Sequence, residues 1–244
     1  MTKFKISYKL FFGLLSFTVM IAYYVWGIFN NNDIIDVYNG NYETFTIDYF
    51  TTFTLLSNVL VHAWLIAAGI NYKQEGKSKL LGHTTANTLA TLITLTFIIY
   101  NFVLIPVQGF PTQTFSWITS IINHVITPII FVIYVNFMME NKEIVIKKEY
   151  ILKKFWIPFT MTLAYCLFAM FRGELRLKSG YTESILYPYF FLNVHKVGPM
   201  GIPGYGWFAI AFVLVVVILF SFSFLYNCIN NKMVTRKFIK TSTF

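Results

Sequence analysis

Polar side chains recur inside stretches of this sequence that are otherwise apolar enough for a membrane. The clearest case is residues 49–58, YFTTFTLLSN, which contain three threonines, a serine and an asparagine. Thr54 is followed at helical spacing by Asn58 and His62, so these three residues share one helix face. A histidine can accept a proton, and an ionisable residue within a membrane span is a functional candidate by default. The stretch therefore combines hydrogen-bonding and proton-accepting groups where lipid would otherwise be.

Two further stretches carry the same kind of pattern. Their polar residues are Ser116, Ser120, Asn123, His124 and Thr127 in one stretch, and Thr84, Thr88 and Thr91 in the other. Hydrogen bonds between membrane helices are the ordinary use of such residues, at about 0.6 kcal/mol a pair, and we interpret the threonines of the second stretch in this way. Among the histidines, His124 has the position that most favours function, whereas His62 lies deeper and His83 lies beside a lysine-rich loop.

The elements that must position these residues follow from composition and charge. Hydrophobic residues make up 57% of the chain and charged residues 12%, against roughly 45–50% and 25% in a typical soluble domain. A span needs about 20 mostly apolar residues, and the turn PVQGFPTQ divides the longest uncharged run. The predicted spans are about 10–29, 50–71, 86–106, 116–138, 155–171 and 206–228. The sequence thus predicts an all-α polytopic membrane protein, with residues 1–244 forming a single domain of six transmembrane helices.

Lysine and arginine residues set the expected orientation. Fifteen of the 19 flank one side of the predicted spans, and the exceptions are Arg172, Arg176, Lys178 and Lys196. Both termini are therefore expected in the cytoplasm, in a multi-pass protein of the cell membrane. The net charge of +9 fits this bias and an attraction to anionic lipid, rather than nucleic-acid binding.

In this orientation, Thr54 and His124 both lie in the outer half of the bilayer. The second and fourth spans run inward, which places Thr54 roughly 6 Å and His124 roughly 12 Å below the outer face at 1.5 Å per residue. The two side chains would meet if those spans are neighbours.

The outer connection between the fifth and sixth spans is too aromatic for a solvated loop. Residues 187–192 read YPYFFL, which suits a segment that lies at the membrane interface or turns back to cap a cavity. An aromatic belt that anchors the loop explains the same residues. Arg172 is expected to end the fifth span, where it would snorkel to headgroups or contact an anionic group of a substrate.

Four motifs, taken in chain order, resemble one family. They are FTLLSN at 53–58, NHVITP at 123–128, RG at 172–173 and YPYFFLNVHKVG at 187–198. This combination resembles the androgen-induced-protein family, and most closely its bacterial branch of six-span proteins. Animal members are integral membrane hydrolases that cleave fatty acid esters of hydroxy fatty acids with a threonine and a histidine. The resemblance covers nearly the whole chain, and it implies a bacterial plasma-membrane protein whose partner is a fatty acyl ester or another membrane lipid.

The resemblance also implies roles for individual residues. It maps the nucleophile to Thr54 and the base to His124, with Thr52 as the alternative nucleophile and Thr51 as the third. This sequence lacks the second histidine that animal members carry just after the NH pair. The substrate pocket is expected to contain Asn58, Asn123, Arg172, Tyr187 and Tyr189.

The implied chemistry is acyl transfer. A threonine hydroxyl needs an adjacent base to attack an ester, and burial favours the neutral histidine that can accept its proton. The acyl group would pass to Thr54 with release of the hydroxy-acid half, and water would then hydrolyse the acyl-threonine with His124 as base. Asn58 or Asn123 would donate a hydrogen bond to the oxyanion.

Two other classes of function fit the same residues. A transporter would line a path with the polar stripes, although these gather in the outer half and no inverted repeat is evident. A lipid-binding protein without catalysis would keep the pocket alone. In all three cases the sequence predicts no metal and no cofactor, because Cys166 and Cys228 have no metal-ligand spacing.

Overall fold

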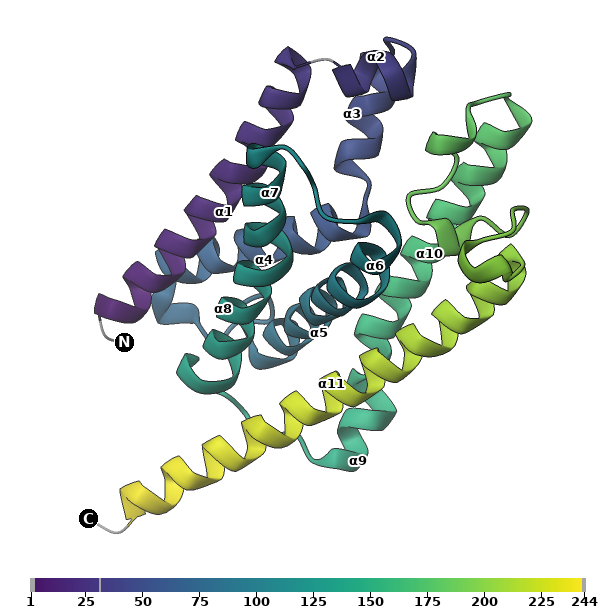
Figure 1. Cartoon of the computed structure of the whole chain (residues 1–244). Helices are drawn as coiled ribbons and strands as arrows, with labels where there is room; N and C mark the ends of the chain where they lie inside the picture. Colours follow the sequence, from purple (N-terminus) through teal and green to yellow (C-terminus); the bar gives the residue numbers. More distant parts are fainter. Residues whose placement is uncertain (1–2, 31, 243–244) are drawn as a thin grey trace.

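The chain folds into helices joined by turns. The computed structural model describes residues 3–30 and 32–242, and it contains no strand within those ranges. Its α-helices are α1 (Lys3–Phe29), α2 (Asn32–Tyr38), α3 (Tyr42–Phe50), α4 (Phe53–Ile70), α5 (His83–Ile99), α6 (Ile105–Gln108), α7 (Thr114–Ile121), α8 (Thr127–Ile133), α9 (Lys147–Glu149), α10 (Trp156–Lys178) and α11 (Gly204–Ser242) (Figure 1). Short π-helical segments continue several of them, at Tyr100–Leu104, Ile122–Ile126, Tyr134–Met138 and Tyr150–Lys154. The all-α class predicted from the sequence is confirmed for the described residues.

Six helical segments are long and apolar enough to cross a membrane. They are Lys3–Phe29, Phe53–Ile70, His83–Gln108, Thr114–Met138, Lys147–Lys178 and Gly204–Lys237. In number and order they agree with the six spans predicted from the uncharged runs.

The fifth segment is longer than predicted. It covers Lys147–Lys178, whereas the uncharged run indicated 155–171 and placed Arg172 at its end. Arg172 and Arg176 instead lie inside α10, and both pair with Asp48 of α3, at 3.2 and 2.7 Å. A carboxylate partner lowers the cost of burying a guanidinium group, so the helix does not end at its first charge.

The connection between the first two spans also differs from the predicted loop, because it contains α2 and most of α3. Asn41 caps α3 by accepting a hydrogen bond from the Thr44 backbone N–H at 2.9 Å. α3 leads almost directly into α4. Asp48 is therefore held on a helix beside the start of α4.

α1 and α4 approach closely because glycines face the partner helix. A Cβ atom on Gly13 would lie 2.9 Å from Cγ1 of Ile66, and one on Gly69 would lie 2.5 Å from Cδ2 of Leu10. Small residues permit this backbone approach between membrane helices, where packing rather than the hydrophobic effect drives association. The two contacts fix the register of α1 along α4.

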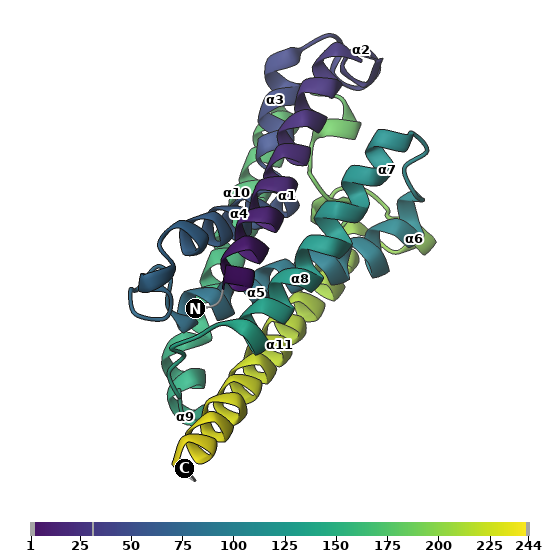
Figure 2. The ribbon, with the colours of Figure 1, turned by 90° about the vertical axis from the view of Figure 1, so that its left-hand side faces the viewer.

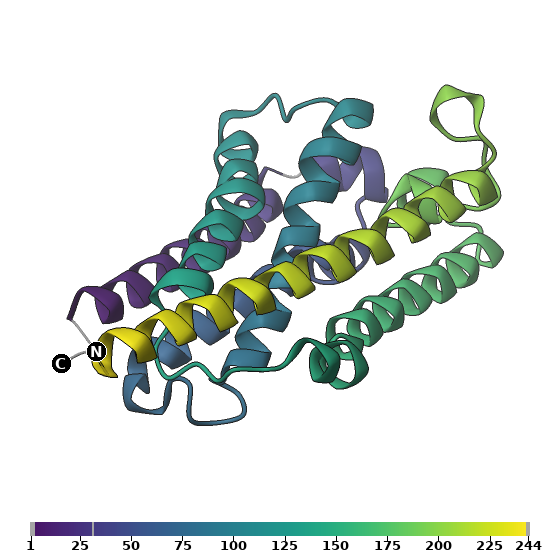
Figure 3. The same ribbon diagram turned by 90° about the horizontal axis from the view of Figure 1, so that it is seen from below.

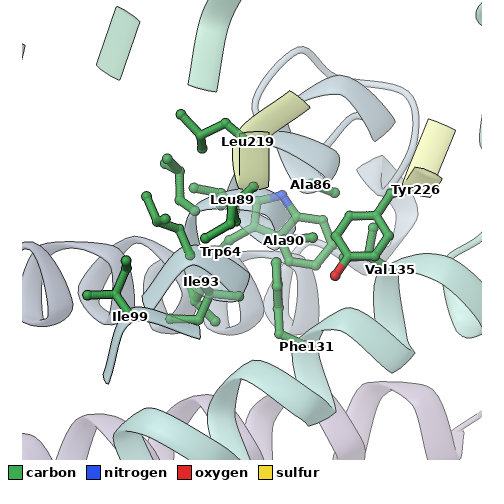
Figure 4. Close-up of a cluster of buried hydrophobic side chains, with 14 of the residues drawn as sticks. Trp64, Ala86, Leu89, Ala90, Ile93, Ile99, Phe131, Val135, Leu219 and Tyr226 are labelled. Carbon is green, nitrogen blue, oxygen red and sulfur yellow. The ribbon is translucent and has the colours of Figure 1, made fainter. Parts of the chain in front are cut away.

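α5 lies at the centre of the helices. Its residues 86–96 are buried on every side, which is typical of a helix surrounded by others. Figure 4 shows the apolar cluster around it, to which α8 and α11 contribute Phe131 and Leu219. The buried hydroxyl of Thr94 bonds that of Tyr226 on α11 at 2.7 Å, a polar link between two helices.

The two ends of the molecule differ. α2 and α3 lie at one end, and the beginning of α1 and the end of α11 lie toward the other (Figure 2). We call the end with α2 and α3 the cavity end, because a cavity lies there, and the other the termini end. Seen from below, α10 runs beside α11 along one flank (Figure 3).

A buried ion pair lies toward the termini end. Lys9 of α1 contacts Glu75 in the turn after α4, and neither side chain is exposed. The Tyr134 hydroxyl donates to the same carboxylate, 2.8 and 2.9 Å from its two oxygens, and the Glu140 backbone N–H donates at 3.2 Å. Lys9 Nζ also donates to the Ala68 carbonyl at 2.6 Å. Each charge thus has several partners, the condition under which a buried pair is tolerated.

Removing one member of this pair is expected to destabilise the protein strongly. Glu75→Ala removes the carboxylate that the buried Lys9 ammonium contacts, and breaking a buried pair costs about 3–5 kcal/mol. Thermal unfolding in detergent should show a clearly lower midpoint. The control is Lys5→Ala, which breaks a 2.6 Å pair with Glu140 whose side chains are 21% and 28% exposed. That loss is expected to be about 1 kcal/mol or less, and equal losses in the two variants would contradict this account.

Candidate functional site

A cavity of about 670 Å³ lies at the cavity end, between α3, α4, α7 and the segment that follows α10. It gathers eight residues that the sequence assigned to a site: Thr52, Thr54, Asn58, Asn123, His124, Arg172, Tyr187 and Tyr189. The second and fourth spans are neighbours here, because Nδ2 of Asn58 donates to the Asn123 carbonyl at 3.2 Å. That adjacency is the condition under which Thr54 and His124 share one site. We call this space the polar cavity.

Two of the threonines before α4 have structural partners. Thr52 is the N-cap of α4, and its hydroxyl oxygen accepts from the Leu55 backbone N–H at 3.2 Å. Thr51 donates to the Ile47 carbonyl at 2.5 Å and accepts from Nη1 of Arg172. Both hydroxyls therefore hold the chain in place where it enters the helix.

Thr54 is held by its backbone instead. Its carbonyl accepts from the Ser57 hydroxyl and from Nδ2 of Asn58, both at 2.9 Å. Its backbone N–H donates to the Tyr189 hydroxyl at 3.4 Å, and that hydroxyl also lies against the Thr54 side chain. The Thr54 hydroxyl makes no bond to its own helix, so of the three it is the one best placed to meet a ligand.

His124 lies on the π-helical turn Ile122–Ile126 and lines the polar cavity. Its Nδ1 is 2.9 Å from the Ser120 carbonyl, so the neutral ring carries its proton there and keeps a lone pair on Nε2. The ring stacks on that of Tyr100, with centroids 3.4 Å apart and planes 8° apart. The Tyr100 hydroxyl is in turn 2.5 Å from that of Ser120. A fixed tautomer with a free Nε2 is what a proton-accepting histidine requires.

Asn58 and Asn123 differ in the groups they leave unpaired. Nδ2 of Asn58 donates to the carbonyls of Thr54 and Asn123, which fixes the orientation of its amide. Its Oδ1 is buried without a partner. Asn123 leaves its whole side-chain amide unpaired: its Oδ1 is also buried without a partner, and its Nδ2 donates to no residue in the described part of the chain. The expectation that either asparagine could donate to an oxyanion is thus narrowed to Asn123.

A charged cluster lies on one side of the polar cavity. Asp48 pairs with Arg172 and Arg176, and both Asp48 and Arg172 line the cavity. One carboxylate between two guanidinium groups leaves a net positive charge, and Nε of Arg172 is buried without a partner. Sequence reasoning missed Asp48, because its only signal is a single acidic residue just before an apolar span, and its arginine partners are far away in the chain.

Tyr187 and Tyr189 line the polar cavity from the segment after α10. The Tyr187 hydroxyl donates to Glu174 at 2.5 Å. Its ring lies against Gly173, where a Cβ atom would be only 2.1 Å from Cε1. Burial raises the pKa of both tyrosines, so both phenols keep their protons and can donate hydrogen bonds.

His62 and His83 lie away from this cavity. His62 is fully buried one turn along α4 from Asn58, and His83 is buried at the start of α5; neither ring has a hydrogen-bond partner. No group of three or more His, Cys, Asp or Glu side chains in residues 3–30 and 32–242 is arranged to hold a metal ion.

A narrow second cavity of about 90 Å³ adjoins the polar one. It lies among α5, α10 and α11, and its walls are almost wholly apolar; we call it the apolar slot. Thr54, Tyr100, Leu104 and Tyr189 line both spaces. Thr54 therefore stands at the boundary between a polar and an apolar compartment.

Comparison with known proteins places the chain in no group. No family model, curated protein or solved structure matches it. The resemblance to the androgen-induced-protein family stays a prediction from the motifs.

Gly173 is expected to be required for the position of Tyr187. In Gly173→Ala the new methyl group would overlap the tyrosine ring, so the ring and its bond to Glu174 must shift. Overpacking of this kind costs about 1–3 kcal/mol, which thermal unfolding in detergent would detect. In a Tyr187→Ala background the same substitution is expected to cost far less, because the ring it meets is absent. If Gly173→Ala lowered stability equally with and without the Tyr187 ring, the strain would not come from contact with that ring.

Proposed function

We propose that the protein is an integral membrane hydrolase of lipid esters, with Thr54 as nucleophile and His124 as base. The observation that carries the proposal is the position of Thr54, which lines both the polar cavity and the apolar slot. His124 lines the same polar cavity with Nε2 free to accept a proton. An ester at this boundary would have its acyl chain on the apolar side and its polar half beside the imidazole.

The reaction proceeds in two acyl-transfer steps. Nε2 of His124 takes the Thr54 hydroxyl proton as Oγ1 attacks the ester carbonyl carbon, and the oxyanion accepts a hydrogen bond from Nδ2 of Asn123. The intermediate collapses to acyl-threonine, and His124 returns its proton to the departing alcohol. A water molecule, deprotonated by His124, then attacks the acyl-threonine, which releases the fatty acid and restores the Thr54 hydroxyl.

The charged cluster supports an anionic substrate. Arg172 has an unpaired buried Nε, and the Asp48 carboxylate balances only one of its two guanidinium partners. A carboxylate on the alcohol half of the ester would supply the missing acceptor, and guanidinium groups bind carboxylates through strong charge-assisted bonds. Fatty acid esters of hydroxy fatty acids have this chemistry.

In the cell membrane, the positive-inside bias places the termini end in the cytoplasm. The polar cavity then faces the outer side, where substrate from the outer leaflet reaches it. This orientation and the membrane insertion are part of the proposal.

Lipid binding without catalysis is the second candidate. The observation that favours it is that Thr54 and His124 make no hydrogen bond to each other here. Nucleophile and base often draw together only when substrate is bound, so a hydrolase would form this bond at that stage.

Labelling of the detergent-solubilised protein by a lipophilic fluorophosphonate tests the hydrolase. Wild type is expected to label, and Thr54→Ala and His124→Ala are expected to lose label by about 10²-fold or more, since each removes a required group. Thr52→Ala is the matched control: it removes a helix cap, costs about 1 kcal/mol of stability and should keep its label. Undiminished labelling of Thr54→Ala, or an unlabelled but folded wild type across several chain lengths, would overturn the proposal.

Arg172→Gln is expected to act selectively on anionic substrates. Loss of a charge-assisted bond worth about 1.5–3 kcal/mol should lower kcat/KM for an ester with a free carboxylate by about 10- to 100-fold. The methyl ester of the same substrate is the internal control, and its kcat/KM should change little. Equal losses for the two substrates would mean that Arg172 acts only through the fold.

A further inference from the structure

The proposed hydrolase function does not explain what the apolar slot binds along its length or from where that ligand enters. α11 lines it with Phe208, Ala211, Phe212, Val215 and Leu219, at spacings that put them on one helix face. The rise from residue 208 to 219 corresponds to roughly 16 Å. The face of α11 that lines the slot is therefore about three helical turns long.

The Tyr165 hydroxyl, at the Thr54 end of the slot, is buried without a hydrogen-bond partner. The threonine hydroxyls farther along the walls are already paired. The Thr162 hydroxyl donates to the Pro158 carbonyl at 2.9 Å, and the Thr96 hydroxyl bonds that of Ser57 at 2.8 Å. A headgroup or sugar would lose its hydrogen bonds with water there and gain none. The chemical class that fits is a hydrocarbon chain.

Polar groups collect at one end of the slot only. Tyr165, whose ring packs on Phe53 at 5.2 Å, lies with Tyr189 and Thr54 where the slot meets the polar cavity. A chain in the slot would therefore place a polar end group at Thr54 and its apolar tail along α11.

The slot is reachable from the membrane side. Phe212 lines it and is 43% exposed, and the next residue, Val213, points outward at 61% exposed. α10 runs beside α11 on the same flank. The surrounding solvent at this depth is lipid acyl chain, so the ligand is present at high concentration where the slot opens.

We propose that the apolar slot binds a single fatty acyl chain, which enters laterally from the bilayer between α10 and α11. Ala211 is the smallest side chain in its wall and is buried, so its size sets the width available to the chain. The assignment of the chain's polar end to Thr54 rests on the proposed hydrolase function, whereas binding of the chain does not.

A photoreactive palmitic acid analogue, with a diazirine near its methyl end, tests the slot. The full chain with Thr54→Ala would be labelled in detergent, with and without excess palmitic acid, and the adducts mapped by mass spectrometry. Adducts are expected on the slot-lining residues of α10 and on Phe208, Ala211, Phe212, Val215 and Leu219 of α11, and they should disappear with competitor. Labelling that competitor does not reduce, spread over outward-facing residues such as Val213, would overturn the proposal.

Two substitutions on neighbouring positions of α11 sharpen the test. Ala211→Phe fills the slot and is expected to weaken competed labelling by about tenfold or more. Val213→Phe adds the same ring on the membrane-facing side and should leave labelling unchanged. Ala211→Leu, a smaller change, should give an intermediate loss and serves if the phenylalanine variant unfolds. If Ala211→Leu and Ala211→Phe both fold and are labelled as strongly as the wild type, the assignment of an acyl chain to the slot is overturned.

The Thr54→Ala background separates this proposal from the hydrolase. Competed labelling of the slot, combined with an unlabelled wild type in the fluorophosphonate assay, would support the slot and overturn catalysis. Hydrolysis by the wild type without any competed labelling of the slot would support catalysis and overturn the assignment of the slot.

Discussion

A polar group buried among apolar side chains is costly unless it finds a partner within the protein, and the packing of this molecule depends on several such pairings. The amide of Asn58 reaches the Asn123 carbonyl and joins the second span to the fourth. The hydroxyls of Thr94 and Tyr226 join the third span to the sixth. Apolar side chains supply most of the contact area, but they fit many arrangements almost equally well. Polar links of this kind favour one arrangement, because a shift of either helix would leave both groups unpaired.

The Lys9–Glu75 pair and the polar cavity meet the same constraint in opposite ways. At the termini end, Lys9 and Glu75 are buried together, and Tyr134 and backbone groups complete their hydrogen bonds. At the cavity end, Oδ1 of Asn58 and Nε of Arg172 stay buried without partners. A closed network suits a structural role, whereas unpaired groups that line a cavity suit the binding of a ligand that completes them.

The division of the interior into a polar and an apolar compartment suits an amphiphile. Thr54 and Tyr189 line both compartments, so a ligand with one polar and one apolar half would be held at its junction. The same arrangement explains why Tyr187 and Tyr189 come from a segment that turns back over the helices.

The sequence by itself determined the helical class, the number of candidate spans and the polar faces that include Thr54 and His124. These follow from local rules, because charge excludes a residue from lipid and helical periodicity decides which residues share a face. Only the tertiary structure decided that the second and fourth spans adjoin, that Asp48 pairs with Arg172 and Arg176, and that α10 therefore extends beyond its uncharged run. It also decided that Nδ2 of Asn58 donates hydrogen bonds to two carbonyls, those of Thr54 and Asn123. Those outcomes depend on which helices pack together and in what register, and neither is encoded in the pattern of any one helix.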